Sequence, residues 1–222
     1  MTAAVTTDTD LDEAPTTDDG GRRGIRRFGT LALAAAVVVG LLLGYAGGLL
    51  TPSFTRPGDN SVEAGFARDM TTHHAQAVAM GLMAFQQGED PEVRQIGGDI
   101  ATGQQGEIGT MQTWLRLWKL DPTGDQPPMA WMSDGAAVVK DGLMPGMATP
   151  DEMTKLREAR GHEFDLLFLQ LMIRHHLGGV HMIQGVLDGG HDKDVLLVAQ
   201  TMKNTQQTDL TNLQAALKRL GG

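Results

Sequence analysis

The sequence predicts an all-α protein, in which one N-terminal transmembrane helix precedes an antiparallel four-helix bundle built from two helical-hairpin repeats. Two observations carry this prediction: an uncharged run near the N-terminus, and a His-His motif that recurs at a constant offset. Aromatic residues make up only 5% of the 222 residues, and runs of β-branched residues are few. Both features argue against a β-sheet protein.

The uncharged run covers residues 28–50 and is long enough to cross a bilayer core of roughly 30 Å. Arginines lie directly before this run, within residues 22–27. They place the polar tail, residues 1–27, in the cytoplasm, where we expect it to be disordered. The protein is therefore predicted to be a single-pass protein of the cell membrane, held in the lipid bilayer by residues 28–50, with an extracytoplasmic C-terminal domain.

A cleaved signal peptide is the alternative interpretation of this segment. The stretch Tyr45-Ala46-Gly47-Gly48 offers a cleavage site, but apolar residues resume at Leu49. An uncleaved signal anchor is therefore favoured. Residues 51–59 contain two prolines and a glycine and are predicted to be a linker, so the exported domain is expected to cover residues 60–222.

A motif in the first half of the exported domain recurs in the second half. The offset is 102 residues at every matched position, without a gap, and such a match indicates duplication of one structural unit. The same offset relates Glu107 to Asp209. The matched residues are Phe66, Met70, His73, His74 and Met80 in the first copy, and Phe168, Met172, His175, His176 and Met182 in the second.

Start and stop signals divide the first repeat, residues 60–120, into two helices. We expect the first helix to run from about Ser61 to Gln87, where a glycine follows. Asp90 then caps a second helix with Pro91 at its first position, which is a favoured helix start.

The second repeat, residues 149–222, has equivalent signals. Thr149 and Glu152 form a capping-box pattern around a proline. The helix that they start is expected to end at a Gly-Gly pair, with a break near Gly161. Asp192 caps the last helix. Four long helices joined in pairs by short turns predict an antiparallel bundle with a pseudo-two-fold axis.

A long crossover, residues 121–148, joins the repeats and is rich in proline and glycine. It contains four methionines, of which Met144 and Met147 flank a Pro-Gly pair. Methionine is over-used in the whole chain, with 13 of 222 residues. Such methionines either fill irregular gaps in a core or donate thioether sulfur to a soft metal.

On a helix with about 100° per residue, the motif residues of each copy fall in one stripe, as wide as a core-facing surface. Two adjacent histidines therefore flank a methionine on the buried side of each first helix. Ala77 and Gly179 leave room beside the motifs, which fits either a cavity or close helix contact. The alternative is that these histidines and methionines are ordinary core residues.

If the stripes of the two copies face each other, four histidines and four methionines share one interior. Imidazole is costly to bury there without hydrogen-bond or metal partners. Neutral imidazole and thioether form a ligand set suited to copper, and to Cu(I) especially. His181 projects away from the stripe and is expected to be exposed. Glu107 and Asp209 either supply carboxylates to the site or are solvated charges.

Several classes of function are disfavoured. The chain has no cysteine, so thiolate metal sites and disulfides are impossible, and its formal charge of −9 does not attract nucleic acid. It has no Glu-x-x-His pair for a di-iron site, no zinc-protease motif, no phosphate-binding loop and no nucleophile elbow. We therefore expect a protein that is not an enzyme.

The segments Phe66-Ala-Arg-Asp-Met70-x-x-His73-His74 and Met172-x-x-His175-His176 resemble the bacterial exported family known as domain of unknown function 305. The resemblance covers about residues 60–220 and implies a ferritin-like four-helix bundle, with periplasmic copper binding in some members. Two departures are Leu171, which stands where the first copy has Asp69, and Gly179, where alanine is usual. Carried over by position, the matching residues are Asp69, Met70, His73, His74, Met80, Met172, His175, His176 and Met182.

The sequence thus predicts a membrane-anchored, extracytoplasmic metal-binding protein that sequesters copper or hands it on. The alternative is an envelope interaction or scaffold module whose buried histidines and methionines are only structural. Redox chemistry at the bound metal is a third reading. The expected metal residues are Asp69, Met70, His73, His74, Met80, Met144, Met147, Met172, His175, His176 and Met182.

Overall fold

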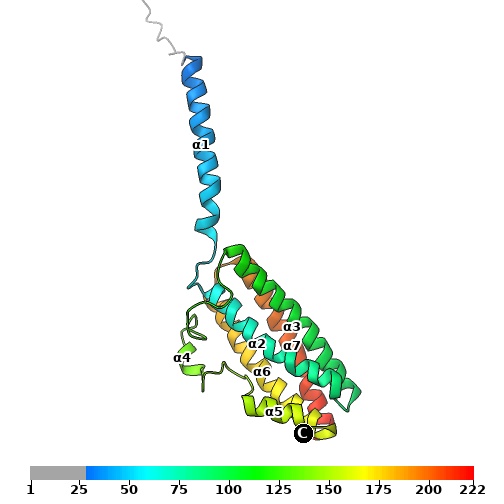
Figure 1. The fold of residues 1–222 in the computed structure, drawn as a ribbon. Helices are drawn as coiled ribbons and strands as arrows, with labels where there is room; N and C mark the ends of the chain where they lie inside the picture. The colour runs from blue at the N-terminus through cyan, green and yellow to red at the C-terminus, as the bar shows by residue number, and fades with distance from the viewer. Residues whose placement is uncertain (1–28) are drawn as a thin grey trace, which may run out of the picture. The chain divides into compact units, whose positions relative to one another are not determined.

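The structure is a computed structural model that describes residues 29–222, and the elements of these residues are helices (Figure 1). The predicted all-α class is confirmed. The chain divides into two compact units between Phe54 and Thr55. The helices are α1 (Thr30–Thr55), α2 (Val62–Gln87), α3 (Pro91–Trp118), α4 (Gly135–Val138), α5 (Pro150–Glu158), α6 (Gly161–Gly189) and α7 (Lys193–Arg219).

Helix α1 is the described part of the first unit. Its segment Thr30–Leu49 is long and apolar enough to cross a membrane, and its side chains are exposed to the surroundings. A signal sequence near the N-terminus can meet the same criteria of length and hydropathy. The helix continues to Thr55 and so overlaps the start of the segment that was expected to be a linker from residue 51. The predicted cytoplasmic tail, residues 1–27, lies outside the described residues.

The second unit contains four long helices, α2, α3, α6 and α7, which lie side by side in Figure 1. Helices α2 and α3 form one hairpin, α6 and α7 form the other, and α2 also packs on α6. The start of α2 meets the end of α6, because Val62 lies 3.6 Å from the Cβ position of Gly189. The two first helices of the repeats are therefore antiparallel neighbours, as the predicted bundle requires.

Local signals start the helices where the sequence places them. Ser61 caps α2 by accepting a hydrogen bond from the third helical amide, and Asp90 and Asp192 cap α3 and α7 in the same manner. Thr149 and Glu152 make both bonds of the predicted capping box. These bonds satisfy backbone N–H groups that have no partner within a helix.

Two equivalent carboxylates link the hairpins, because each accepts hydrogen bonds from backbone amides in the turn of the other hairpin. Glu63 of α2 accepts hydrogen bonds from the backbone amides of residues 191 and 192, at 2.6 and 3.1 Å. Asp165 of α6 accepts from the amides of residues 89 and 90, at 3.0 and 2.8 Å. Both carboxylates are buried, and both the acids and the turns are related by the offset of 102 residues. Each repeat thus caps the turn of the other.

The second repeat differs from the first in its opening helix. The break that was expected near Gly161 separates α5 from α6, and Gly161 itself has a φ of 58°. Non-glycine residues rarely adopt this left-handed conformation, so glycine suits the break. The crossover before α5 carries the short helix α4, and α5 contacts both α2 and α6.

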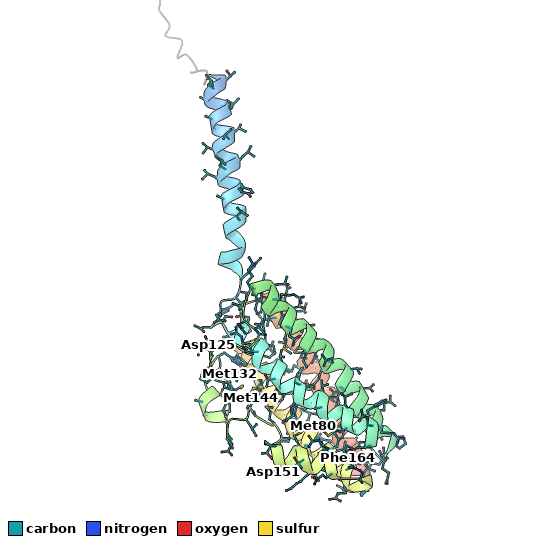
Figure 2. All side chains as sticks on the ribbon, in the orientation of Figure 1. Met80, Asp125, Met132, Met144, Asp151 and Phe164 are labelled. Atoms are coloured by element: carbon teal, nitrogen blue, oxygen red, sulfur yellow. The ribbon has the colours of Figure 1, made fainter. Side chains whose placement is uncertain are left out.

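The buried core consists of two apolar clusters along the bundle. Figure 2 labels Met132 and Met144 beside one part of the bundle, and Met80 with Phe164 nearer its other end. Methionine is concentrated in the first cluster. Its buried methionines are Met70, Met111, Met129, Met144, Met182 and Met202, whereas those of the second cluster are Met80 and Met172.

Candidate metal centre

The two His-His pairs meet in the middle of the bundle. His73, His74 and His176 are completely buried, and His175 is 1% exposed. The rings of His73 on α2 and His175 on α6 lie with their centroids 3.8 Å apart and their planes tilted by 35°. The structure therefore brings the two predicted stripes together into one interior.

Each outer histidine of the pairs is bonded to a carboxylate on the second helix of its own repeat. His74 Nε2 lies 2.7 Å from Glu107 Oε2, and His176 Nε2 lies 3.3 Å from Asp209 Oδ2. The carboxylates are 22% and 23% exposed. They are therefore not fully solvated charges, and each contacts the outer histidine of its pair. A carboxylate behind an imidazole fixes its orientation and tautomer, as in the outer shell of metal sites.

Hydrogen bonding leaves ring nitrogens of three histidines without a partner. The carbonyl of Pro145 accepts from His73 Nε2 at 2.9 Å, and Glu107 accepts from His74 Nε2. A neutral imidazole with Nε2–H has its lone pair on Nδ1. Among residues 29–222, His73 Nδ1, His74 Nδ1 and His175 Nε2 have no hydrogen-bond partner.

His176 differs from the other three histidines. Its Nδ1 lies 3.1 Å from the carbonyl oxygen of Met172, and its Nε2 faces the carboxylate of Asp209. Both ring nitrogens of His176 thus lie within contact distance of an oxygen, and neither is left without a polar neighbour as the nitrogens of the other three histidines are. The two copies of the motif are equivalent in sequence but not in the nitrogens that they present.

Burial keeps the inner pair of imidazoles neutral. Desolvation is the main cause that lowers the pKa of His73 to about 3, and the charge repulsion of the nearby His74 lowers it further. Desolvation and the neighbouring His73 hold the pKa of His175 well below its usual value. Neutral imidazole is the form that ligates metals. The two facing rings are therefore in the ligating state at neutral pH.

Two buried amides that are not part of the His-His motif lie close to this interior. Gln104 and Gln206 are 5% and 3% exposed, and within the described chain their Oε1 atoms also lack a hydrogen-bond partner. A Cβ at Gly179 would lie 2.5 Å from Gln206 Oε1. The room that was expected beside Gly179 is therefore filled by this amide. The signal that could have identified the pair is its offset of 102 residues.

The four motif methionines are completely buried and lie in two groups. Met70 and Met182 belong to one apolar cluster, and Met80 and Met172 belong to the other. Each group pairs a methionine from α2 with one from α6, which follows from the antiparallel packing of these helices.

The crossover brings Met144 into the core, where it is 5% exposed, and leaves Met147 half-buried. Between them, Pro145 is bonded to His73, and the Cα of His175 lies 3.0 Å from the Cβ position of Gly146. The Met-Pro-Gly-Met segment therefore covers the facing histidines.

Asp69 anchors the crossover to α2. Its Oδ2 accepts hydrogen bonds from the backbone amide of Met129 and from Trp131 Nε1, both at 2.7 Å. Burial raises the pKa of this carboxyl. Both bonds hold the crossover, so the structure gives Asp69 a positioning role and does not place it with the histidines. The second repeat has Leu171 at the matching position, so this anchor is not duplicated.

No three histidine or carboxylate side chains of residues 29–222 are grouped so that they alone could hold a metal ion. The donors present are imidazole nitrogens without hydrogen-bond partners in this described region, together with the buried thioethers. Thioether selects soft metals such as Cu(I), and imidazole also suits copper. Because the histidines and carboxylates of the described residues form no group of three, a copper site here needs thioether sulfur from methionine as a further ligand.

Comparison with known proteins gives one family and several structural relatives. The family model described as "Domain of unknown function (DUF305)" matches residues 63–217. A DUF305 protein from Streptomyces coelicolor, which is classed as secreted, has 38% sequence identity, and the match covers 74% of this chain and 97% of that protein with a TM-score of 0.69. A DUF305 fragment from Deinococcus radiodurans has 27% identity over 71% of this chain and 96% of the fragment, with a TM-score of 0.60.

CopM is a third structural relative, and its structures contain Cu(I), Cu(II) or silver. The Cu(II)-bound form of CopM has 25% identity to this chain, with a TM-score of 0.57. The match covers 72% of this chain and 97% of CopM. No curated protein sequence matches the chain.

Proposed function

Because the chain belongs to the DUF305 family, we propose that it binds copper, preferentially as Cu(I), in the histidine–methionine interior between α2 and α6. The observation that carries the proposal is a set of buried imidazole nitrogens that have no hydrogen-bond partner in residues 29–222. Leaving a buried polar atom unpaired costs about 1–3 kcal/mol. A bound cation would remove this cost. The metal-bound structures of CopM, a relative in fold, support the same choice.

The residues have distinct roles in this proposal. His73 Nδ1, His74 Nδ1 and His175 Nε2 are the nitrogen donors, because their lone pairs are not used by hydrogen bonds within the described chain. Glu107 orients His74 by accepting its Nε2–H. His176 supports the site without ligating, since both of its nitrogens face acceptors.

The thioethers provide the soft donors of the site. Met70 and Met182 flank the histidines within one apolar cluster, and Met80 and Met172 flank them within the other. Met144 and Met147 lie on the segment that covers His73 and His175, and they would guide the metal past this segment. Sulfur donors stabilise Cu(I), so the copper remains in one oxidation state.

The protein sequesters copper or hands it on and catalyses no reaction. It acts outside the cytoplasm, where α1 holds it at the membrane. The apolar segment Thr30–Leu49 and the family member that is classed as secreted support this location. Protease added to intact cells should digest residues beyond 56 and spare the N-terminal tail. Digestion of the tail from outside would contradict the orientation, and a mature N-terminus near Gly47 would identify a cleaved signal.

An anaerobic Cu(I) titration of the full chain in detergent, against a competing chelator, tests the function. The double variant His73→Gln/His175→Gln should bind Cu(I) much more weakly than the parent. A matched double variant, His162→Gln/His191→Gln, removes two exposed histidines and should bind like the parent. If the first pair also binds like the parent, the buried histidines are core packing, and the scaffold reading holds.

A further inference from the structure

Outside the copper interior, a histidine and an aspartate face each other on the surface of the bundle. His181 of α6 and Asp134, just before α4, line a pocket of about 460 Å³ together with Met132 and Asp188. His181 is 42% exposed and Asp134 is 43% exposed. The sequence predicts that His181 is exposed. The next residue, Met182, is completely buried, so His181 and Met182 lie on different faces of α6.

The contact between these two side chains is not an ordinary ion pair. His181 Nε2 lies 3.1 Å from Asp134 Oδ2, which is close enough for an ion pair. However, His181 Nε2 is shielded from solvent and makes no aligned hydrogen bond to any residue of the described range 29–222. The same is true of Asp134 Oδ1. Two adjacent ligands that are each about 2.1 Å from one metal ion lie about 3 Å apart, with lone pairs that converge on the ion.

The backbone around Asp134 also favours a ligand role for its carboxylate. Asp134 occupies the N-cap position of α4, where aspartate usually accepts a hydrogen bond from a helical amide. Its side chain makes no such capping bond. The carboxylate is instead turned toward His181 on α6.

A thioether lies in the same pocket. Met132 Sδ is 2.8 Å from the Cβ position of Gly185, one turn after His181 on α6. Any larger residue at position 185 would displace this side chain. Glycine therefore lets Met132 lie directly against α6 beside the His181–Asp134 pair.

We propose that His181 Nε2 and the Asp134 carboxylate bind a divalent transition-metal ion at the surface, with Met132 as a neighbouring donor and water completing the coordination. Imidazole with carboxylate suits Cu(II), whereas the interior, with several thioethers, suits Cu(I). This outer site goes beyond the proposed interior site and shares no ligand with it. It would give the protein a separate binding site for the oxidised ion.

Cu(II) titration of the full chain in detergent, followed by electron paramagnetic resonance, tests the outer site. The experiment uses the His73→Gln/His175→Gln background, which removes the two facing interior histidines. One Cu(II) signal with coupling to a single nitrogen should appear. It should be lost in His181→Asn and weakened in Asp134→Asn, while the exposed control His191→Asn should leave it unchanged.

Two outcomes would overturn the outer site. Cu(II) binding with unchanged nitrogen coupling in His181→Asn would place the ion elsewhere. A lower melting temperature of metal-free Asp134→Asn, with Cu(II) binding unaffected, would make the pair a structural contact only. Anaerobic Cu(I) affinity of His181→Asn should equal that of the parent. Failure of the outer site and failure of the interior site are therefore separate results.

Discussion

Acidification should destabilise the metal-free domain through its buried histidines. Burial lowers the pKa of His73 from its ordinary 6.5 to about 3 in the folded state, and unfolding restores the ordinary value. Between these two values the unfolded chain binds a proton that the folded chain does not. The free energy of unfolding therefore decreases as pH falls through 6.5. At pH 5 the loss from His73 alone is about 2 kcal/mol, because one pKa unit corresponds to about 1.4 kcal/mol.

Urea denaturation of residues 56–222, followed by tryptophan fluorescence at about pH 7.5 and about pH 5, measures this loss. Ordinary carboxylates titrate at about 4 and stay ionised in this window. The variant His73→Gln should lose roughly 2 kcal/mol less than the parent on acidification, whereas the exposed control His162→Gln should match the parent. Asp69 acts with the opposite sign, because burial raises its pKa, but it is present in all three proteins. An equal loss in His73→Gln and parent would refute the buried neutral imidazole.

Two further predictions concern the contacts that hold the bundle together. Glu63→Ala and Asp165→Ala should each lower the free energy of unfolding by roughly 2 kcal/mol, because each leaves two backbone amides of a turn without their carboxylate. The exposed control Glu163→Ala should change it little in the same urea experiment, and parent-like stability of the first two variants would contradict the reciprocal caps. Gly179→Ala should push the Gln206 amide aside, because the new Cβ would lie 2.5 Å from its Oε1. That amide is the end of a flexible side chain, and alanine favours a helix interior by about 1 kcal/mol over glycine, so the melting temperature should change little. In a Gln206→Ala background the same substitution should raise the melting temperature, and an equal effect in both backgrounds would show that the amide does not fill this space.

Much of the bundle could be predicted because its signals are local. The caps at Ser61, Asp90, Thr149 and Asp192 depend on residues within one helical turn, and the structure contains all four. The break at Gly161 was also visible in the sequence. The path of the crossover was not, because it depends on contacts such as those of Asp69, which join residues far apart in the chain.

The sequence predicts which histidines face each other in the candidate site, but not the contacts of their individual ring nitrogens. Helical periodicity and the constant offset place His73 against His175, since a duplicated helix packs on its own copy through the same face. The sequence could not distinguish His74 from His176, because their hydrogen bonds depend on ring orientation. Nor could it reveal that the carbonyl of Pro145 occupies one nitrogen of His73.

X-ray absorption spectroscopy at the copper edge, on the full chain loaded anaerobically with one equivalent of Cu(I), reports directly whether histidine and methionine together bind the copper. We expect nitrogen and sulfur scatterers together in the first coordination shell. The volume-conserving variant Met70→Leu/Met172→Leu should keep the fold and lose part of the sulfur contribution. A shell of nitrogen and oxygen alone, unchanged in this variant, would contradict a copper centre made of histidine and methionine.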